Sequence, residues 1–173
     1  DRLLVTENAS KRFAEKLDAA KFAPELVKPT EISKLTGKDA VHQGLLVLAP
    51  PLRDPHLDEL AEAGRPIIIL DQITDPHNVG AIIRSAAACN AAGLIMTARH
   101  SPQASWVLAK SASGGIEHVP ILKVTNLSSA IAALIKSGVE CVGLDSEAET
   151  CLEDTVKSIA NLAIVLGAEG KGL

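Results

Sequence analysis

The chain has 173 residues, of which 47% are apolar and 22% are charged, and its formal net charge is -4. This length is enough for one complete domain and part of a second, and the composition of a globular protein excludes a disordered chain. No apolar run approaches the roughly 18–20 residues that a membrane-spanning helix needs, so we expect no membrane segment. Nucleic-acid-binding domains are commonly basic, and the mild acidity of this chain does not by itself favour such a partner.

The three cysteines and five histidines form no cluster in the sequence. Cys89, Cys141 and Cys151 show no Cys-x-x-Cys spacing, and we expect the first two to be small buried apolar residues. Thiols that stay reduced are typical of the cytoplasm, so we expect a cytoplasmic protein. The histidines are scattered, so we expect no metal site.

Residues 1–52 are predicted to form a small α/β segment, and residues 53–63 a polar connecting helix that Gly64 ends. Within the segment, an apolar stripe predicts a first helix, a second short helix ends at Gly37, and residues 44–49 form a buried strand. The predicted helix caps are Asn8 or Ser10 for the first helix and Thr30 for the second.

From residue 64 onward the pattern becomes regular. The predicted strands are residues 67–70, 94–96, 119–122, 139–144 and 162–166. The predicted helices are residues 79–91, about 104–112, and 127–136, the last capped by Asn126 and stopped by Gly138. Because these strands are continuously apolar and alternate with helices, they predict a parallel sheet that is covered on both faces.

Residues 70–93 are the first run that contains candidate functional residues. A predicted strand leads there into a polar loop and a helix. Ligands bind at such strand ends in α/β sheets. Asn78 stands where a helix cap belongs. Arg84 has apolar neighbours on the helix, so we expect a buried guanidinium that needs a partner. Its spacing leaves two interpretations open, a structural ion pair with Asp71 or Asp75, or a cation that belongs to a site.

A glycine-rich loop follows the last predicted strand. Residues 163–173 read Ala-Ile-Val-Leu-Gly-Ala-Glu-Gly-Lys-Gly-Leu. Glycine permits positive φ and close backbone approach, so the N–H groups of such a loop are able to bind a ligand. The loop lacks the Ser or Thr that follows the lysine of a Walker A motif, and it does not match GxGxxG. Taken alone, this run favours an ordinary loop.

Taken together, the two runs closely resemble the first and second signature motifs of the SpoU (TrmH-like) family of RNA 2′-O-methyltransferases, in the SPOUT superfamily. The matching residues of the first motif are Asp75, Pro76, Asn78, Gly80, Arg84, Ser85 and Ala86. The second motif matches as a strand followed by Gly-x-Glu-Gly-x-Gly, beginning at Gly167. The resemblance implies an α/β fold with a parallel sheet flanked by helices and a C-terminal trefoil knot.

The resemblance also implies a division of the chain. Residues 64–173 resemble the methyltransferase domain, and residues 1–52 resemble, more weakly, part of a ribosomal-protein-like RNA-binding domain through the run at residues 41–44. Residues 53–63 would be the linker helix between them. The third family motif, whose helix closes the knot, should follow Leu173. We therefore expect this chain to lack part of the cofactor pocket and of the dimer interface.

S-adenosylmethionine is the cofactor that the resemblance implies, with transfer of its methyl group to a ribose 2′-hydroxyl and without a metal. The expected catalytic residues are Asn78, Arg84 and Glu169. The expected cofactor-binding residues are Gly143, Leu144, Gly167 and Ala168. The family gives the role of base to Arg84. Because a guanidinium ordinarily stays charged, an equally open role is to bind a phosphate and stabilise developing alkoxide charge.

RNA is the partner that the family implies, and a homodimer is the expected assembly. A guanosine of 23S ribosomal RNA is the preferred substrate, because the preceding domain resembles that of members acting on ribosomal RNA, and transfer RNA stays open. Lysines within residues 1–63 are candidates for a basic face, although acidic residues interleave with them. Two other interpretations are a non-catalytic RNA-binding family member and an unrelated α/β enzyme that binds a nucleotide at residues 167–172.

Overall fold

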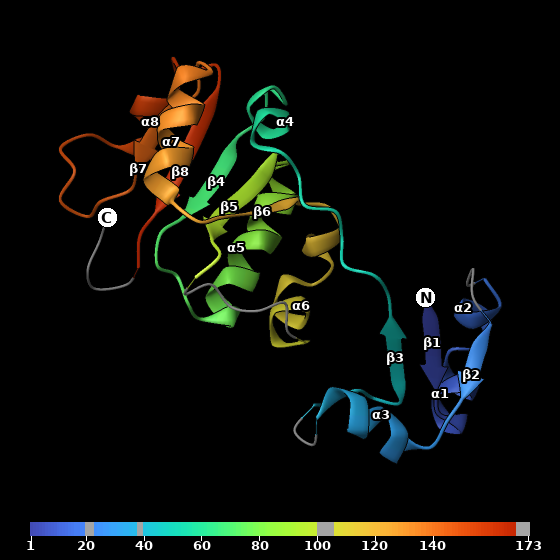
Figure 1. Cartoon of the computed structure of the whole chain (residues 1–173). Coiled ribbons are helices and arrows are strands. Elements are labelled where there is room, and N and C mark those ends of the chain that lie inside the picture. Colours follow the sequence, from blue (N-terminus) through green and yellow to red (C-terminus); the bar gives the residue numbers. More distant parts are fainter. Residues whose placement is uncertain (20–22, 38–39, 100–105, 169–173) are drawn as a thin grey trace. The chain divides into compact units, whose positions relative to one another are not determined.

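The computed structural model of the chain describes residues 1–19, 23–37, 40–99 and 106–168 (Figure 1). It divides into two compact units, Asp1–Leu52 and Arg53–Leu173. None of the helices in these described ranges is long and apolar enough to cross a membrane. The same residues contain no group of His, Cys, Asp and Glu side chains that could hold a metal ion.

The first unit is a three-stranded sheet with helices packed against it. The strands are β1 (Arg2–Val5), β2 (Pro24–Leu26) and β3 (Leu45–Leu48), and the helices are α1 (Glu7–Arg12), α2 (Ala14–Asp18) and α3 (Pro29–Thr36). The central strand β1 pairs in parallel with β2 and antiparallel with β3. Leu3, Val5 and Ala9 form the small core of this unit, and Phe13 and Leu17 pack against it.

Several sequence-based predictions for this unit are wrong in detail. The cap of α1 is Thr6, whose Oγ1 accepts a hydrogen bond from Ala9 N at 3.4 Å, and neither Asn8 nor Ser10. Thr30 is not a cap either, because Pro29 already occupies the first position of α3. The predicted end of α3 at Gly37 is confirmed, with φ at 91°.

Two further differences concern the sheet of this unit. The strand β3 is only half-buried, and Val47 is exposed, so the prediction of a buried strand over residues 44–49 is wrong. The strands β1 and β2 were not predicted, because each has no more than four residues and is too short to show a clear hydrophobic pattern. A sheet of three short strands with two open edges, at β2 and at β3, leaves such residues near solvent.

The second unit is an α/β domain with a parallel sheet of five strands, which confirms the predicted fold class. Its strands are β4 (Ile67–Leu70), β5 (Gly93–Thr97), β6 (Ile121–Val124), β7 (Glu140–Gly143) and β8 (Leu162–Leu166). Its helices are α4 (Leu57–Ala61), α5 (Pro76–Ala88), α6 (Trp106–Ala112), the 3-10 turn η1 (Gly115–Glu117), α7 (Leu127–Lys136) and α8 (Leu152–Val156). Every strand pair in this sheet is parallel.

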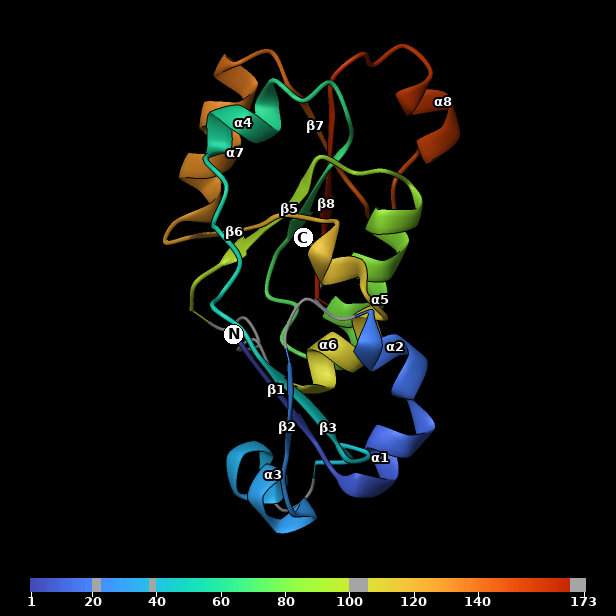
Figure 2. The ribbon, with the colours of Figure 1, turned by 90° about the vertical axis from the view of Figure 1, so that its right-hand side faces the viewer.

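Helices cover both faces of this sheet, as the continuous apolar strands predict. Figure 2 shows α4 and α7 on one side of the strands and α5 on the other. The α7 side buries Ile69 and Ile95 against Leu134. The α5 side buries Leu94 against Ile83 and other residues of α5 and α6. The predicted connecting helix is reduced to α4, which buries Leu60 in the core on the α7 side.

Local signals explain where the helices of this unit begin. Asn126 Oδ1 accepts a hydrogen bond from Ser129 N at 2.9 Å, which confirms the predicted cap of α7. The cap of α5 is Asp75, whose Oδ1 accepts from His77 N at 2.9 Å, and the helix starts at Pro76. The predictions that this helix starts at residue 79 and that Asn78 caps it are therefore wrong.

The cysteines differ in their surroundings. Cys89 follows α5 and is exposed, so the prediction that it is buried is wrong. Cys141 lies half-buried on β7, and its burial raises the pKa of its thiol. Cys151 is exposed.

The order of the strands creates one point where the direction in which successive strands are added to the sheet reverses. The order is β6-β5-β4-β8-β7, so the chain builds outward from β4 through β5 to β6 and then crosses to β7 at the opposite edge (Figure 1). The strand β8 then returns to lie between β7 and β4. Ligands bind at the carboxyl ends of strands at such a switch point. The C-terminal knot involves chain beyond the described residues and stays a prediction.

Candidate active site

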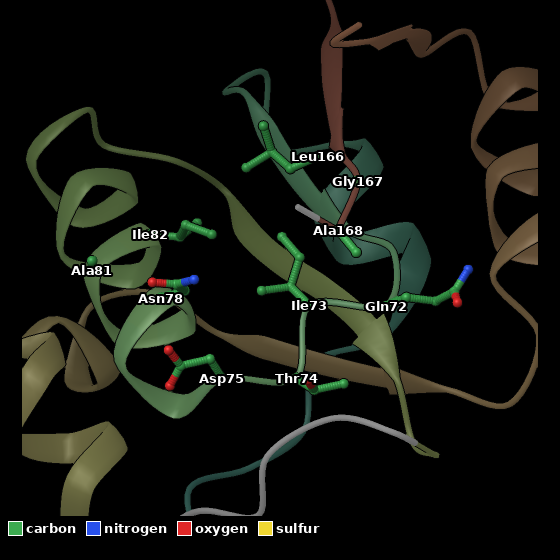
Figure 3. A pocket seen from close by; sticks show the side chains of 10 residues that line it. All are labelled: Gln72, Ile73, Thr74, Asp75, Asn78, Ala81, Ile82, Leu166, Gly167 and Ala168. Atoms are coloured by element: carbon green, nitrogen blue, oxygen red, sulfur yellow. The ribbon is translucent and has the colours of Figure 1, made fainter. Parts of the chain in front are cut away.

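A cavity of about 560 Å³ opens at this switch point (Figure 3). Three segments line it: the loop after β4, one face of α5, and the end of β8. The lining residues are Gln72, Ile73, Thr74, Asp75, Asn78, Ala81, Ile82, Leu166, Gly167 and Ala168. A hydrogen bond from Asp71 N to Leu166 O, 2.9 Å long, joins the two strand ends.

The wall formed by α5 follows from helical spacing. Asn78, Ala81 and Ile82 stand at positions i, i+3 and i+4, which share one face of a helix. The cap at Asp75 fixes the start of α5 and therefore the direction of this face. Figure 3 shows the Asn78 amide and the Ile82 side chain projecting from α5 toward the cavity. The half-buried side-chain amide carries both hydrogen-bond donors and an acceptor.

The opposite wall is mostly backbone and apolar side chains. Gly167 and Ala168 continue β8 past its last paired residue, so their peptide groups border the cavity without bulky side chains. Ile73 projects between α5 and Ala168, whereas the Gln72 side chain points away from the other lining side chains (Figure 3). The backbone of Gln72 lies in the left-handed region, with φ at 56°, which turns the loop sharply after β4. Apolar walls with a few polar groups are typical of small-molecule sites.

Asp75 is the only ionisable side chain among the described residues that line the cavity. One carboxylate oxygen is occupied as the cap of α5. The carboxylate is exposed.

Arg84 lies outside this cavity. Its side chain is exposed, so the prediction of a buried guanidinium is wrong. Six residues along a helix separate Arg84 from Asn78, which places them about 120° apart around the axis and roughly 9 Å apart along it. Within the described residues, Arg84 forms no ion pair with Asp71, with Asp75 or with any other carboxylate.

The other predicted site residues fall into three groups. Gly167 and Ala168 line the cavity together with Asn78. Gly143 and Leu144 lie at the carboxyl end of β7, where Leu144 N donates to Val165 O at 3.0 Å, so they border β8 without lining the cavity. Glu169 lies outside the described residues.

Sequence reasoning missed the apolar part of the cavity. Ile73, Ile82 and Leu166 supply its apolar walls, and no polar signal distinguishes them from core residues. Helical spacing from Asn78 was the available signal for Ala81 and Ile82.

Comparison with known proteins identifies the second unit. A family model described as the SpoU rRNA Methylase family matches residues 65–173. The chain belongs to this family. This membership removes the interpretation of the chain as an unrelated nucleotide-binding enzyme.

Relatives of the SpoU family extend the match to the first unit. An uncharacterized tRNA/rRNA methyltransferase of Mycobacterium leprae (strain TN) is 34% identical over 152 residues, covering 85% of this chain and 48% of that protein. A protein of Staphylococcus haemolyticus (strain JCSC1435), assigned to the TrmH family of tRNA/rRNA methyltransferases, is 34% identical over 91% of this chain and 66% of its own length. The chain therefore spans about half to two thirds of these relatives.

Solved structures of SpoU proteins share the fold. The SpoU methyltransferase AviRb from Streptomyces viridochromogenes, in complex with its cofactor AdoMet, has a TM-score of 0.79 at 23% identity, covering 99% of this chain and 67% of that chain. An rRNA methyltransferase from Sinorhizobium meliloti has a TM-score of 0.70 at 24% identity, covering 100% of this chain and 65% of that chain. At these identities the likeness shows the fold.

Proposed function

We propose that the chain is part of an S-adenosylmethionine-dependent RNA methyltransferase that modifies a ribose 2′-hydroxyl. The favoured substrate is a guanosine of 23S ribosomal RNA, and transfer RNA is the alternative. The observation that carries this proposal is the cavity at the switch point, where the amide of Asn78 faces the backbone of Gly167 and Ala168. These residues come from both family motifs, which are far apart in the sequence.

The cavity suits S-adenosylmethionine in size and lining. Its volume of about 560 Å³ lies within the range of roughly 300–1,000 Å³ that small-molecule sites occupy. Gly167 and Ala168 would hold the cofactor through their peptide groups. Gly143 and Leu144 would hold its adenosine part, since Leu144 is 37% exposed beside the end of β8 and offers an apolar surface to a base. Bound there, the cofactor supplies an electrophilic methyl group.

The residues of the chain would then orient the ribose and stabilise the negative charge that develops as its 2′-hydroxyl loses a proton. Asn78 would hold the ribose through its amide, and Glu169 would take part in the same contact. Arg84 is exposed and forms no ion pair among the residues that the structure describes, which favours phosphate binding and stabilisation of alkoxide charge over a role as base. Holding the reacting groups in line would supply much of the rate.

We also propose a homodimer that works in the cytoplasm. The chain would act as part of a longer protein, because it spans about half to two thirds of the length of its relatives. The competing proposal within the family is a non-catalytic RNA-binding protein.

Transfer of a labelled methyl group from S-adenosylmethionine to RNA tests the proposal. We expect the whole protein to label ribosomal RNA, and the product to resist alkaline cleavage at one position, because alkaline cleavage requires a free 2′-hydroxyl. Asn78→Ala and Arg84→Ala should each abolish labelling, while calorimetry shows that Arg84→Ala still binds S-adenosylhomocysteine. Arg65→Ala is the matched control, since Arg65 is exposed and lies before the opposite, amino end of β4.

Three results would contradict parts of the proposal. RNA binding without methyl transfer would favour the non-catalytic family member. A labelled product that alkali still cleaves at the modified position would rule out the ribose 2′-hydroxyl. Loss of both labelling and cofactor binding in Arg84→Ala would assign Arg84 a structural role.

A further inference from the structure

The exposed surfaces of α5 and α6 carry cations but no carboxylate. Residues 53–173 contain nine Lys and Arg against fourteen Asp and Glu, yet the sequences of α5 and α6 contain neither Asp nor Glu. They contain Arg84 and Lys110, which are both exposed and, within the described residues, take part in no ion pair. These two helices therefore carry two cations and no carboxylate of their own, while the exposed Asp75 caps α5 and the exposed Glu117 follows α6 in η1.

An aromatic ring lies beside one of these cations. Trp106 is the only tryptophan of the chain, and its side chain is 45% exposed at the start of α6. Lys110 follows four residues later, so both side chains share one face of the helix. An exposed indole offers a flat apolar surface of the kind on which nucleobases stack.

The helix α6 is fixed tightly to α5 on the side that faces away from the cavity, because Gly80 at this contact stands about 160° around the helix from the lining residues Asn78 and Ile82. Ser111 Oγ donates to His77 O at 3.0 Å, next to the lining residue Asn78. A Cβ on Gly80 would lie 2.5 Å from Ser111 Cβ, which shows how closely the two backbones approach. Trp106 lies five residues before Ser111, or about 7.5 Å along the helix.

We propose that Trp106, Lys110 and Arg84, hereafter the α5–α6 face, bind single-stranded RNA on the side of α5 that lies opposite the cavity. An unpaired base stacks on the Trp106 indole, and Lys110 and Arg84 bind phosphates on either side of the seam between the helices. This inference rests on the proposed function and adds the surface that holds the RNA.

The first unit gives a weaker case for this role. Its 52 residues contain eight Lys and Arg and seven Asp and Glu, so its charge is nearly balanced. Arg2 is paired with Glu25 at 2.7 Å, and Lys11 is paired with Glu7 at 2.9 Å. Cations held in this way contribute less to phosphate binding than the unpaired cations of the α5–α6 face.

Fluorescence anisotropy of the whole protein with a labelled unpaired RNA of about 12 nucleotides tests the proposal. Trp106→Ala should weaken RNA binding by about 5- to 150-fold, the range expected for the loss of one stacked base. Trp106→Phe should restore most of the affinity, since a phenyl ring also stacks. Lys110→Gln should reduce the salt dependence of binding, the slope of log K against log salt, by about 0.7.

Two matched controls lie on α7, which covers the other face of the sheet. Ile135 is an apolar side chain with 56% exposure, and Lys136 is an exposed cation. Ile135→Ala and Lys136→Gln should bind RNA as the unchanged protein does. Binding of S-adenosylhomocysteine and the thermal unfolding midpoint should be the same in all variants, because every altered side chain is exposed.

Two results separate this inference from the proposed function. If the unchanged protein methylates and binds RNA but Trp106→Ala binds it as tightly as Ile135→Ala does, the α5–α6 face is overturned and the proposed function stands. If light scattering shows that Trp106→Ala changes the oligomeric state, the face is a contact between subunits and the inference is likewise overturned. Failure of the unchanged protein to bind or methylate RNA would overturn both.

Discussion

Replacing Gly80 with alanine tests the close packing of α5 against α6. A Cβ at this position would lie 2.5 Å from Ser111 Cβ, 2.9 Å from Ser111 Oγ and 3.0 Å from Ala112 N. Ser111 Cβ and Ala112 N are not the ends of flexible side chains, so α6 would have to move away from α5. That movement would also break the hydrogen bond from Ser111 Oγ to His77 O.

The magnitude follows from opposing contributions. Overpacking of a close contact costs about 1–3 kcal/mol, and loss of the hydrogen bond costs about 1 kcal/mol more. Alanine favours a helix over glycine by about 1 kcal/mol, which offsets part of this cost. We therefore expect Gly80→Ala to lower the free energy of unfolding by about 1–3 kcal/mol.

Urea unfolding followed by circular dichroism measures this change, and a double-mutant cycle locates it. Ser111→Gly removes the Cβ that the new methyl group meets, so Gly80→Ala should cost about 1 kcal/mol less in that background. Ser85→Ala is the control, since Ser85 is exposed on α5 and its replacement should change stability by less than about 0.5 kcal/mol. A neutral Gly80→Ala, or strictly additive effects with Ser111→Gly, would refute the close approach of the two helices.

Three further predictions concern other parts of the chain. Asn126→Ala removes the cap of α7 and should lower the free energy of unfolding by about 1 kcal/mol in the same urea assay. The hydrogen bond from Arg2 lowers the pKa of the Glu25 carboxyl, so its stabilising contribution is present above the pKa of the unfolded chain and is lost as the pH falls through the lowered value. An NMR titration should show that this pKa rises in Arg2→Ala, and an unchanged value would contradict the pairing. Burial raises the pKa of the Cys141 thiol, so mass spectrometry should find it alkylated more slowly than the exposed Cys89.

The sequence predicted the sheet of the second unit because strands buried on both faces are continuously apolar. Ile67–Leu70 and Leu162–Leu166 were predicted with the same bounds that the structure has. The third strand was predicted two residues early, at 119–122 instead of Ile121–Val124, since Val119 is buried without being part of the strand. The helix α8 was not predicted, because none of its residues is buried and it therefore shows no apolar stripe.

The order of the strands could not be predicted from these patterns. An apolar run shows that a strand is buried but not which strand it pairs with, and the pairing of β4 with β8 joins segments about a hundred residues apart. The cavity depends on that pairing, so its apolar walls at Ile73 and Ile82 were missed while the motif residues Asn78 and Gly167 were found.

Arg84 shows how a run of small apolar residues misleads. The apolar residues around Arg84 were interpreted as a largely buried helix, but the structure buries only one stripe of it, including Ile83 and Ala86. Ser85 and Ala88 are exposed, and Arg84 is exposed with them. Alanine is compatible with either environment, so it gives no signal of which side of the helix meets solvent.

The insertion of β8 between β4 and β7 has a consequence for biosynthesis. Of the described strands, β4 is made first in this sheet and β8 is made last, yet they are neighbours. During synthesis, one edge of β4 therefore stays without its partner until residue 166 has left the ribosome, and such open edges attract other chains. A polypeptide interrupted before that point would have β4, β5 and α5 but would lack the wall of the cavity that Leu166, Gly167 and Ala168 form.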